Sequence, residues 1–381
     1  MNPRILLFFF LLFCTCSVQA QQQSKLDSLG LHLEELILEG NYEAFDSLFA
    51  WKSLFYDVVN ESMNIEDNSP VMQMALERIK ISNLLREQIT QYNGQFSFLN
   101  AYQAEGKGHL VFRIYSDTGL NYHIYQITWE DDLTITDLFP VGTGELFSVT
   151  IKRLFTEING MREAGVSASV FRENTNRLKD IRTLVEEGNY ERADSVFSTI
   201  PKFIRNEKIF TLVELRVKSG LSDEKYAEAL SAYLERFPND PSVYLRSLDY
   251  LSISEKYDEL FVAIDQLDSL IKGDPLLDMY RGEAYYQKGQ IPQARTYYEK
   301  VTKDLPYILD GQYLLLDLYV ELKEFEKSIK VLDDIEANFW IDPMDLVNYI
   351  EEESFYEQFV KTERFKKWRV GANKRSEEEW K

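Results

Sequence analysis

The sequence predicts an α+β N-terminal domain, made of helices and an antiparallel meander, followed by an all-α helical solenoid. Three observations lead to this fold class. Large apolar residues recur with a period of 34 in the second half, four strand-like runs lie between residues 95 and 139, and an apolar segment opens the chain. At 381 residues the chain is long enough for two or three domains.

The composition narrows the classes of partner. The chain has 42 Lys and Arg against 63 Asp and Glu, a formal net charge of -21, which argues against a nucleic-acid backbone or an anionic membrane as partner. Hydrophobic residues make up 45% of the chain, enough apolar surface to offset the entropy of folding. We therefore expect a folded chain.

Residues 1–20 have the pattern of a secretory signal peptide. Arg4 precedes an apolar run from Ile5 to Phe13, and small and polar residues follow up to Ala20. The run is too short to cross a membrane, which takes about 20 apolar residues. No comparable apolar stretch follows, so we expect no transmembrane segment and an exported protein, periplasmic or extracellular.

Both cysteines, Cys14 and Cys16, lie inside this leader. Cleavage before Gln21 would leave no thiol, so neither a disulfide nor a Cys–zinc site is expected. An alternative is a lipoprotein signal with Cys16 acylated. Only three histidines exist, none at helical i, i+4 spacing, and phosphate-loop and nucleophile-elbow motifs are missing. We expect no metal, no cofactor and no catalytic residue.

Residues 21–160 form the predicted α+β domain. Apolar spacing predicts helices over Leu26–Glu39, Tyr42–Ala50 and residues 70–91. Runs rich in aromatic and β-branched residues, joined by short turn-forming segments, predict an antiparallel meander. The four predicted strands are Gln95–Tyr102, His109–Tyr115, Asn121–Trp129 and Leu133–Phe139.

Helices followed by a meander, with the stretch Gly40-Asn41-Tyr42-Glu43-Ala44 after the first helix, resemble the nuclear transport factor 2 and ketosteroid-isomerase-like superfamily over about Leu26–Phe147. A competing interpretation rests on the pentapeptide at residues 39–43, which is identical to that at residues 187–191. In that interpretation the first two helices are a divergent helical repeat, followed by an unrelated small sheet.

The meander carries a possible polar site. A three-residue loop at residues 117–119 would pair Phe112 with Ile124 and Arg113 with His123. One face would be apolar, and the other would collect a set with the composition for acid–base chemistry. That set is Arg113, Tyr115, His123 and Tyr125, with Asp137 opposite Tyr125. A solvated sheet face has the same composition, so we expect a structural role.

Residues 161–343 form the predicted solenoid of about five helical hairpins. Shifts of 34 align Leu251 with Tyr285 and Tyr319, and apolar residues three or four apart indicate two helices and a turn in each unit. The clearest copy has Gly282, Tyr285, Gly289, Ala294, Tyr298 and Pro306 at fixed spacing. This copy resembles the tetratricopeptide repeat (TPR), whose small residues let paired helices approach.

The resemblance implies a concave face that binds another protein or a peptide. By that resemblance the first helix of each unit lines the groove, which makes it acidic with an apolar strip. The six residues it places there are Leu245, Asp249, Met279, Glu283, Tyr313 and Asp317. A solvated face of carboxylates is the alternative, and the Lys, Arg and Asn set that clamps a peptide carboxylate is missing.

Residues 344–381 are predicted to form capping helices and a basic tail that contains Phe365, Trp368 and Trp380. We expect either that this tail docks on the acidic groove or that it is an ordinary end helix. The whole sequence predicts an exported, non-enzymatic interaction scaffold. The alternative is a small-molecule-binding or catalytic N-terminal domain that the repeats position.

Overall fold

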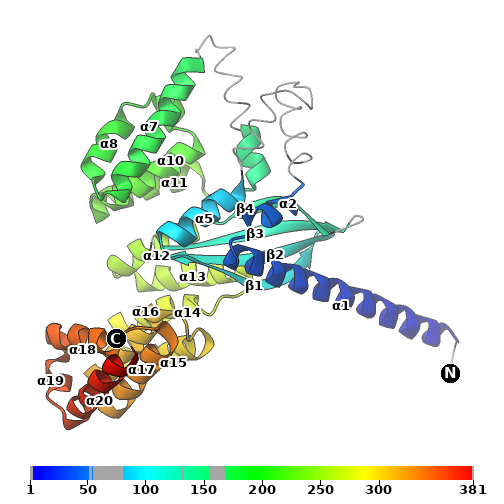
Figure 1. The fold of residues 1–381 in the computed structure, drawn as a ribbon. Helices are drawn as coiled ribbons and strands as arrows, with labels where there is room; N and C mark the ends of the chain where they lie inside the picture. The colour runs from blue at the N-terminus through cyan, green and yellow to red at the C-terminus, as the bar shows by residue number, and fades with distance from the viewer. Residues whose placement is uncertain are drawn as a thin grey trace. The chain divides into compact units, whose positions relative to one another are not determined.

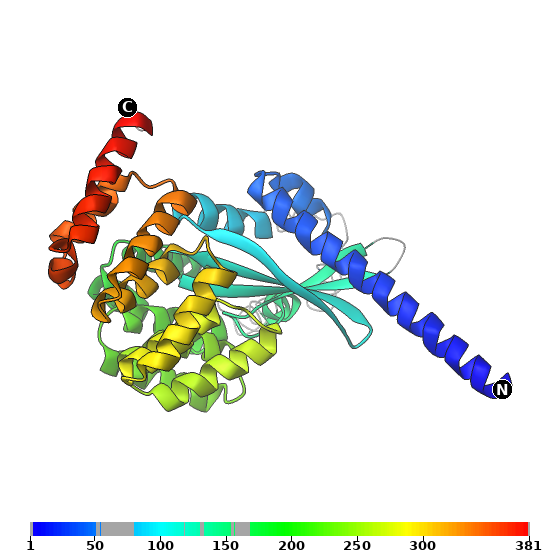
Figure 2. The same cartoon turned by 90° about the horizontal axis from the view of Figure 1, so that it is seen from below.

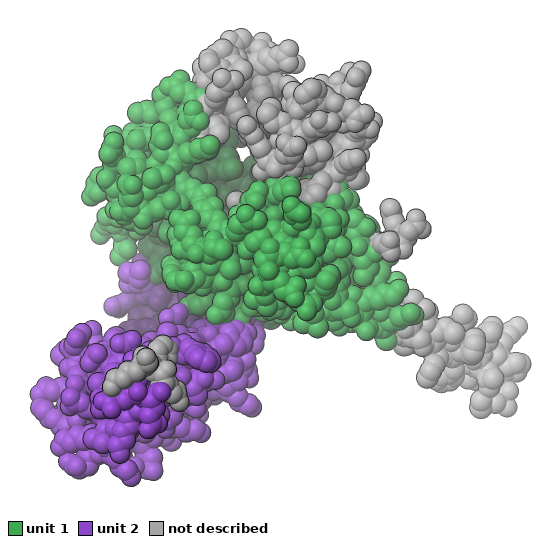
Figure 3. All heavy atoms as spheres, viewed as in Figure 1, with its two compact units in different colours: residues 1–250, 269–273 green, residues 251–268, 274–381 purple. Residues whose placement is uncertain are grey.

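The computed structural model describes residues 3–50, 54, 80–117, 119–129, 133–153, 156 and 168–379. The chain forms two compact units (Figure 3). Unit 1 comprises Met1–Tyr250 and Ser269–Gly273, and unit 2 comprises Leu251–Asp268 and Asp274–Lys381. The predicted helix over residues 70–91 is seen from residue 81 onwards, and its first part lies outside the described residues.

Unit 1 contains the predicted four-stranded antiparallel meander (Figure 1). The strands lie in the order β1-β2-β3-β4, so each pairs with its neighbour in sequence. Their bounds are Gln95–Ala104 for β1, Lys107–Ser116 for β2, Gly119–Trp129 for β3 and Leu133–Pro140 for β4. The sequence prediction of the sheet is confirmed.

Three helices cover one face of this sheet: α1 (Pro3–Leu38), α2 (Tyr42–Ser47) and α5 (Ile81–Gln91) (Figure 2). The core between helices and sheet includes Leu33, Phe45, Leu85, Phe96, Phe112 and Tyr125. Gly30 lets α1 approach the sheet, because a Cβ there would collide with the ring of Phe98. Burial of these aromatic side chains holds the module together.

The rest of unit 1 is helical. The helices are α7 (Ala168–Glu186), α8 (Tyr190–Ser198), α9 (Lys202–Arg205), α10 (Lys208–Ser219), α11 (Asp223–Arg236) and α12 (Ser242–Ile253), the last in unit 1 up to Tyr250. Helices α7 and α8 pair, as do α10 and α11. Gly188 ends the turn between α7 and α8 with a φ of 71°, and Gly40 between α1 and α2 has a φ of 72°. The two identical pentapeptides therefore form the same left-handed turn.

Unit 2 consists of helices. They are α13 (Tyr257–Ile271, in unit 2 up to Asp268), α14 (Leu277–Gln287), α15 (Ile291–Asp304), α16 (Leu309–Glu321), α17 (Phe325–Phe339), α18 (Pro343–Glu352), the 3-10 helix η1 (Ser354–Tyr356), α19 (Glu357–Val360) and α20 (Glu363–Glu379). Helix α14 pairs with α15, and α16 pairs with α17.

The period of 34 residues has a direct backbone counterpart. Glu255, Gly289 and Lys323 stand 34 residues apart at the ends of successive first helices, and all three have a left-handed φ, between 55° and 69°. Within a pair the helices touch where a small residue faces a ring: a Cβ on Gly282 would lie 2.6 Å from the ring of Tyr298. The repeat read from the sequence is therefore present as paired helices.

Helix α20 closes the end of unit 2. Phe365 is fully buried in the core, and the Nε1 of Trp368 donates to Asp333 at 2.7 Å. Helix α20 packs against α17 and α18. Docking of the basic tail on the acidic groove is wrong for Phe365 and Trp368, because both side chains are buried in the core of unit 2. Trp380 lies outside the described residues.

Candidate partner-binding site

The register between β2 and β3 decides which of the predicted polar side chains share a face of the sheet. Ser116 pairs with Gly119, so the β2–β3 turn has two residues rather than the three expected. Phe112 therefore pairs with His123, and Arg113 pairs with Tyr122. A shift of one residue moves a side chain to the other face. The predicted pairing of Arg113 with His123 is wrong.

The five polar side chains consequently lie on two faces. His123 and Tyr125 share the face of Phe112, in the core under the helices, whereas Arg113 and Tyr115 share the opposite face. Asp137 pairs with Gln126 rather than lying opposite Tyr125 as expected, because Tyr125 pairs with Leu138.

Three of these side chains form hydrogen bonds within the module. The Nδ1 of His123 lies 3.2 Å from the hydroxyl of Tyr125, and burial lowers the pKa of His123 to about 4, so the ring is neutral at physiological pH. Asp137 accepts hydrogen bonds from the backbone N–H of Ser148, at 3.2 Å, and from its hydroxyl, at 2.5 Å. The set does not converge on one point where a substrate could react.

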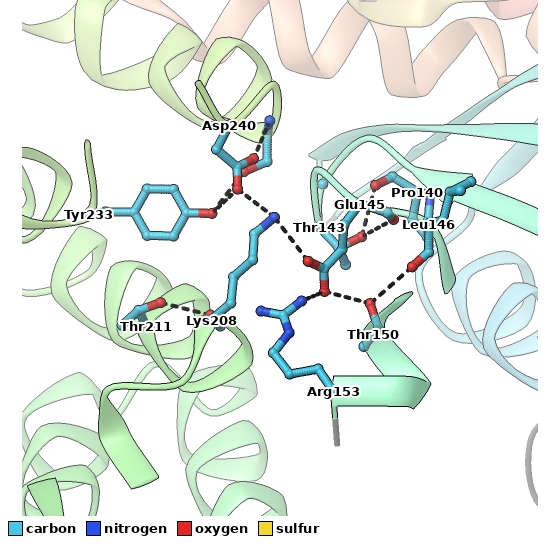
Figure 4. Close-up of polar contacts among 12 residues, drawn as sticks. Pro140, Thr143, Glu145, Leu146, Thr150, Arg153, Lys208, Thr211, Tyr233 and Asp240 are labelled. Atoms are coloured by element: carbon cyan, nitrogen blue, oxygen red, sulfur yellow. Dashed lines mark hydrogen bonds and ion pairs between the residues drawn. The ribbon is translucent and has the colours of Figure 1, made fainter. Parts of the chain in front are cut away.

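A second polar cluster, which we call the lysine clasp, consists of Lys208, Asp240, Glu145, Arg153 and Tyr233 (Figure 4). The Nζ of Lys208 lies 2.5 Å from Oδ2 of Asp240 and 3.5 Å from Oε2 of Glu145. The hydroxyl of Tyr233 donates to Oδ2 of Asp240 at 2.8 Å. Arg153 forms an ion pair with Glu145.

The lysine clasp joins the segment that follows β4 to helices α10 and α11 of unit 1. Arg246 of α12 adds a further link, since its Nη2 donates to the carbonyl oxygen of Gly142 at 2.6 Å. Gly144 fits here because a Cβ at that position would overlap the carboxylate of Asp240. Every charge in the clasp has a partner of opposite sign, so its chemistry is that of a buried ion-pair network.

The six predicted groove residues fall in both units. In unit 1, Leu245 is half-buried and Asp249 is exposed on α12. In unit 2, Met279 and Glu283 lie on α14, and Tyr313 and Asp317 lie on α16; all four are half-buried. Unit 2 therefore presents four of the predicted residues on first helices of successive repeats.

In unit 2 these carboxylates belong to a larger arrangement, which we call the tyrosine–carboxylate row. It consists of Glu283, Asp317 and Glu321 with the tyrosines that donate to them, Tyr298, Tyr356 and Tyr286. Tyr298 donates to Oε2 of Glu283 at 2.9 Å, and Tyr356 donates to Oδ1 of Asp317 at 2.5 Å. Tyr286 of α14 donates to Glu321 of α16 and so connects two repeats.

The row differs in its charge balance from the carboxylates of Asp278 and Glu299, which also lie in unit 2. Within the described chain, none of Glu283, Asp317 and Glu321 forms an ion pair with a lysine, arginine or histidine. Elsewhere Asp278 pairs with Arg281, and Glu299 pairs with Arg295 even though it also accepts from Tyr319. The three carboxylates of the row are thus stabilised by neutral donors, which are the tyrosine hydroxyls and the amide of Gln287, whose Nε2 donates to Oε1 of Glu283 at 2.9 Å.

Burial and mutual repulsion act on these groups. Burial raises the pKa of Asp317, and the negative charge of Glu283 raises it further, while the Tyr356 hydroxyl opposes the shift. Burial and the hydrogen bond to Glu321 raise the pKa of Tyr286 to about 12. The hydroxyl therefore stays protonated as a donor. A cation placed on the row would relieve the repulsion between the carboxylates.

Aromatic rings border the row. Tyr313 of α16 contacts Tyr349 of α18, with ring centroids 5.2 Å apart, and Tyr349 contacts Tyr356 at 6.0 Å. Tyr349 and Phe355 are both more than two-fifths exposed. These rings offer apolar surface next to the negative charge, a combination suited to the methylene stems of lysine or arginine.

The described residues were compared with the requirements of a metal site and of a membrane-spanning helix. Across the described ranges, no group of three or more His, Cys, Asp or Glu side chains could hold a metal ion. In the same part of the chain, no helix is both long and apolar enough to cross a membrane.

Comparison with known proteins finds solved structures of low sequence identity and low TM-score. No family model and no curated protein matches the chain. Among solved structures, a thermophilic TPR protein of Thermus thermophilus is 13% identical and covers 46% of this chain and 97% of its own, with a TM-score of 0.37. PilW, a type IV pilus biogenesis factor, is 11% identical over 54% of this chain and 93% of its own, with a TM-score of 0.42.

A third structure, MamA from Desulfovibrio magneticus RS-1 (residues 41 to the end), is 13% identical over 42% of this chain and 94% of its own, with a TM-score of 0.34. The repeat assignment rests on the structure itself, because the paired helices of unit 2 and their left-handed turns recur every 34 residues, the period of the TPR. The resemblance of the N-terminal half to the nuclear transport factor 2 superfamily finds no support in these matches.

Sequence reasoning missed half of the row. Glu283 and Asp317 were predicted, but Glu321, Tyr286 and Tyr356 were not, and Tyr298 was assigned to packing alone. A signal was present, because Glu321 follows Asp317 by one helical turn and therefore shares its face. The tyrosine donors come from other helices, and helix periodicity does not report on such contacts.

Proposed function

We propose that this protein is an exported, non-enzymatic interaction scaffold whose TPR-like unit 2 binds a lysine- or arginine-bearing segment of a partner protein on the tyrosine–carboxylate row. The observation that carries the proposal is the uncompensated charge of Glu283, Asp317 and Glu321. The tyrosine hydroxyls orient these carboxylates, so a partner need not supply the free energy to order them.

The expected binding mode combines charge and contact area. An exposed ion pair contributes only about 0 to 1 kcal/mol, so a single basic side chain on the row would bind weakly. A segment with several basic residues could place their ammonium or guanidinium groups on the carboxylates and their stems on Tyr313 and Tyr349. The overall charge of -21 would also accelerate association with a basic partner.

Export is the second part of the proposal. It is supported by the leader-like pattern of residues 1–20 and by the position of both cysteines inside it. Acylation of Cys16 is the alternative route, and it would tether the same scaffold to a membrane surface. Mass spectrometry of the protein from its native host, reading the N-terminal residue and any attached lipid, decides between the two.

Fluorescence anisotropy tests the binding proposal. The probe is a labelled Gly/Ser peptide with four lysines at alternate positions, and the control peptide carries glutamine at those positions. We expect saturable binding of the lysine peptide, weakened at least tenfold between 50 and 300 mM salt, and no binding of the glutamine peptide. Equal binding of the two peptides would contradict the proposal.

A further inference from the structure

Trp340 is exposed in an unusual way. It stands at the C-terminal end of α17 with a φ of 52° and a ψ of 40°, in the left-handed region, and its side chain is 84% exposed. Left-handed backbone is unfavourable for a residue with a Cβ, which is why glycine and asparagine usually end helices in this way. Trp340 bears this cost without burying its ring.

The other described non-glycine residues with a positive φ are all polar, such as Asn93 and Lys323. A large apolar ring in such a position is therefore exceptional within this chain. Because neither backbone preference nor core packing explains it, the ring is better accounted for by a contact outside the folded chain.

A pocket of about 450 Å³ lies beside Trp340, lined by Ala337, Ile341 and Pro343 and by three charged residues, Asp333, Glu336 and Arg375. Arg375 is neutralised by Glu336, since its Nε and Nη2 reach the two carboxylate oxygens at 2.5 and 2.7 Å. Oδ1 of Asp333 accepts from the neutral indole of Trp368. Among the described residues no cation pairs with Asp333, so the pocket retains a net negative charge.

We propose that this pocket receives an arginine side chain of a partner protein, with the guanidinium stacked on Trp340 and its charge directed at Asp333. Tryptophan is the strongest aromatic partner for a cation, arginine is the cation most often found there, and both are enriched in binding hot spots. The carboxylate adds charge-assisted hydrogen bonds. This contact is separate from the tyrosine–carboxylate row and does not depend on it.

The test is fluorine NMR of the full chain labelled with 5-fluorotryptophan, in which Trp340→Phe assigns the Trp340 signal. The titrants are N-acetyl-arginine amide, its neutral analogue N-acetyl-citrulline amide, and glucose. We expect a saturable shift of the Trp340 signal with the arginine amide only. A response to citrulline equal to that with arginine, or a response to glucose alone, would overturn the proposal.

Two matched charge variants test the role of the Asp333 carboxylate, and a third variant tests whether the Trp340 ring stabilises the fold. Asp333→Asn should weaken the arginine response at least threefold, whereas Glu326→Gln, which removes an exposed charge from the same helix, should leave it unchanged. Trp340→Gly, measured by thermal melting only, should not lower the melting temperature, because glycine suits the left-handed backbone. Equal responses of the two charge variants would contradict the role of Asp333, and a lower melting temperature of Trp340→Gly would show that the ring is structural.

Discussion

The ammonium of Lys208 lies 2.5 Å from Oδ2 of Asp240, and both side chains are almost completely buried. Glu145 and Tyr233 complete the surroundings, so segments from the sheet module and from the helices meet at this ion pair. A charge removed from such a pair leaves its partner buried and uncompensated, which costs far more than loss of a surface ion pair.

Asp240→Asn is therefore expected to lower the free energy of unfolding by about 3 to 5 kcal/mol. Urea unfolding followed by circular dichroism measures the loss. The control is Asp258→Asn, which removes an exposed carboxylate from its pair with Lys288 and should cost less than about 1 kcal/mol. Similar losses in the two variants would show that the lysine clasp does not stabilise unit 1.

Gly282→Ala tests the packing of α14 on α15. The added Cβ would lie 2.6 Å from the ring of Tyr298, so we expect a loss of about 1 to 3 kcal/mol through overpacking. Ala294→Leu, at a fully buried position of the same core, should cost a similar amount. Thermal melts that coincide with the parent would refute these contacts.

The stability of the sheet module should depend on pH through His123. Burial lowers its pKa to about 4 in the folded state from 6.5, so between these values the unfolded state binds a proton that the folded state does not. Stability is therefore lost as pH falls from 6.5 towards 4, by up to about 3 kcal/mol.

The variant His123→Gln isolates this effect, because the difference in unfolding free energy between it and the parent reports on His123 alone. We expect that difference to change by about 3 kcal/mol between pH 7 and pH 4. His32→Gln, at an exposed histidine of α1, is the matched control for the substitution itself. A constant difference for His123→Gln would contradict the burial argument.

Trp368 should anchor the end cap. Its ring is 7% exposed and its indole N–H donates to Asp333, so Trp368→Ala is expected to cost about 3 to 5 kcal/mol. Urea unfolding measures it. A loss below about 1 kcal/mol would mean that α20 contributes little to the core of unit 2.

The helices and strands could be predicted from the sequence, but the register between paired strands could not. Glu255, Gly289 and Lys323 share one backbone turn, and a local conformation repeated every 34 residues leaves a periodic sequence. The strands were likewise located from local residue types. The register between β2 and β3 instead depends on whether the turn has two or three residues, and Gly119 is compatible with both.

Contacts between segments far apart in the chain also could not be predicted from the sequence. No sequence spacing marks Lys208 and Asp240 as partners. Tyr356, which donates to Asp317, follows it by 39 residues and lies in η1, directly after α18. Such pairings follow from how helices stack, which periodicity alone does not determine. The predicted groove residues Glu283 and Asp317 were found because they share a helix face that the repeat fixes.

The most direct test of the account compares Glu321→Gln with Glu299→Gln in binding of the lysine peptide. Both remove one negative charge from a glutamate that accepts from a tyrosine, but Glu299 is already paired with Arg295 and Glu321 has no such partner within the described chain. Fluorescence anisotropy at 50 mM salt should show at least fivefold weaker binding for Glu321→Gln and parental binding for Glu299→Gln. Equal affinities of the two variants would show that the peptide responds to net charge alone, and would contradict the tyrosine–carboxylate row as the binding site.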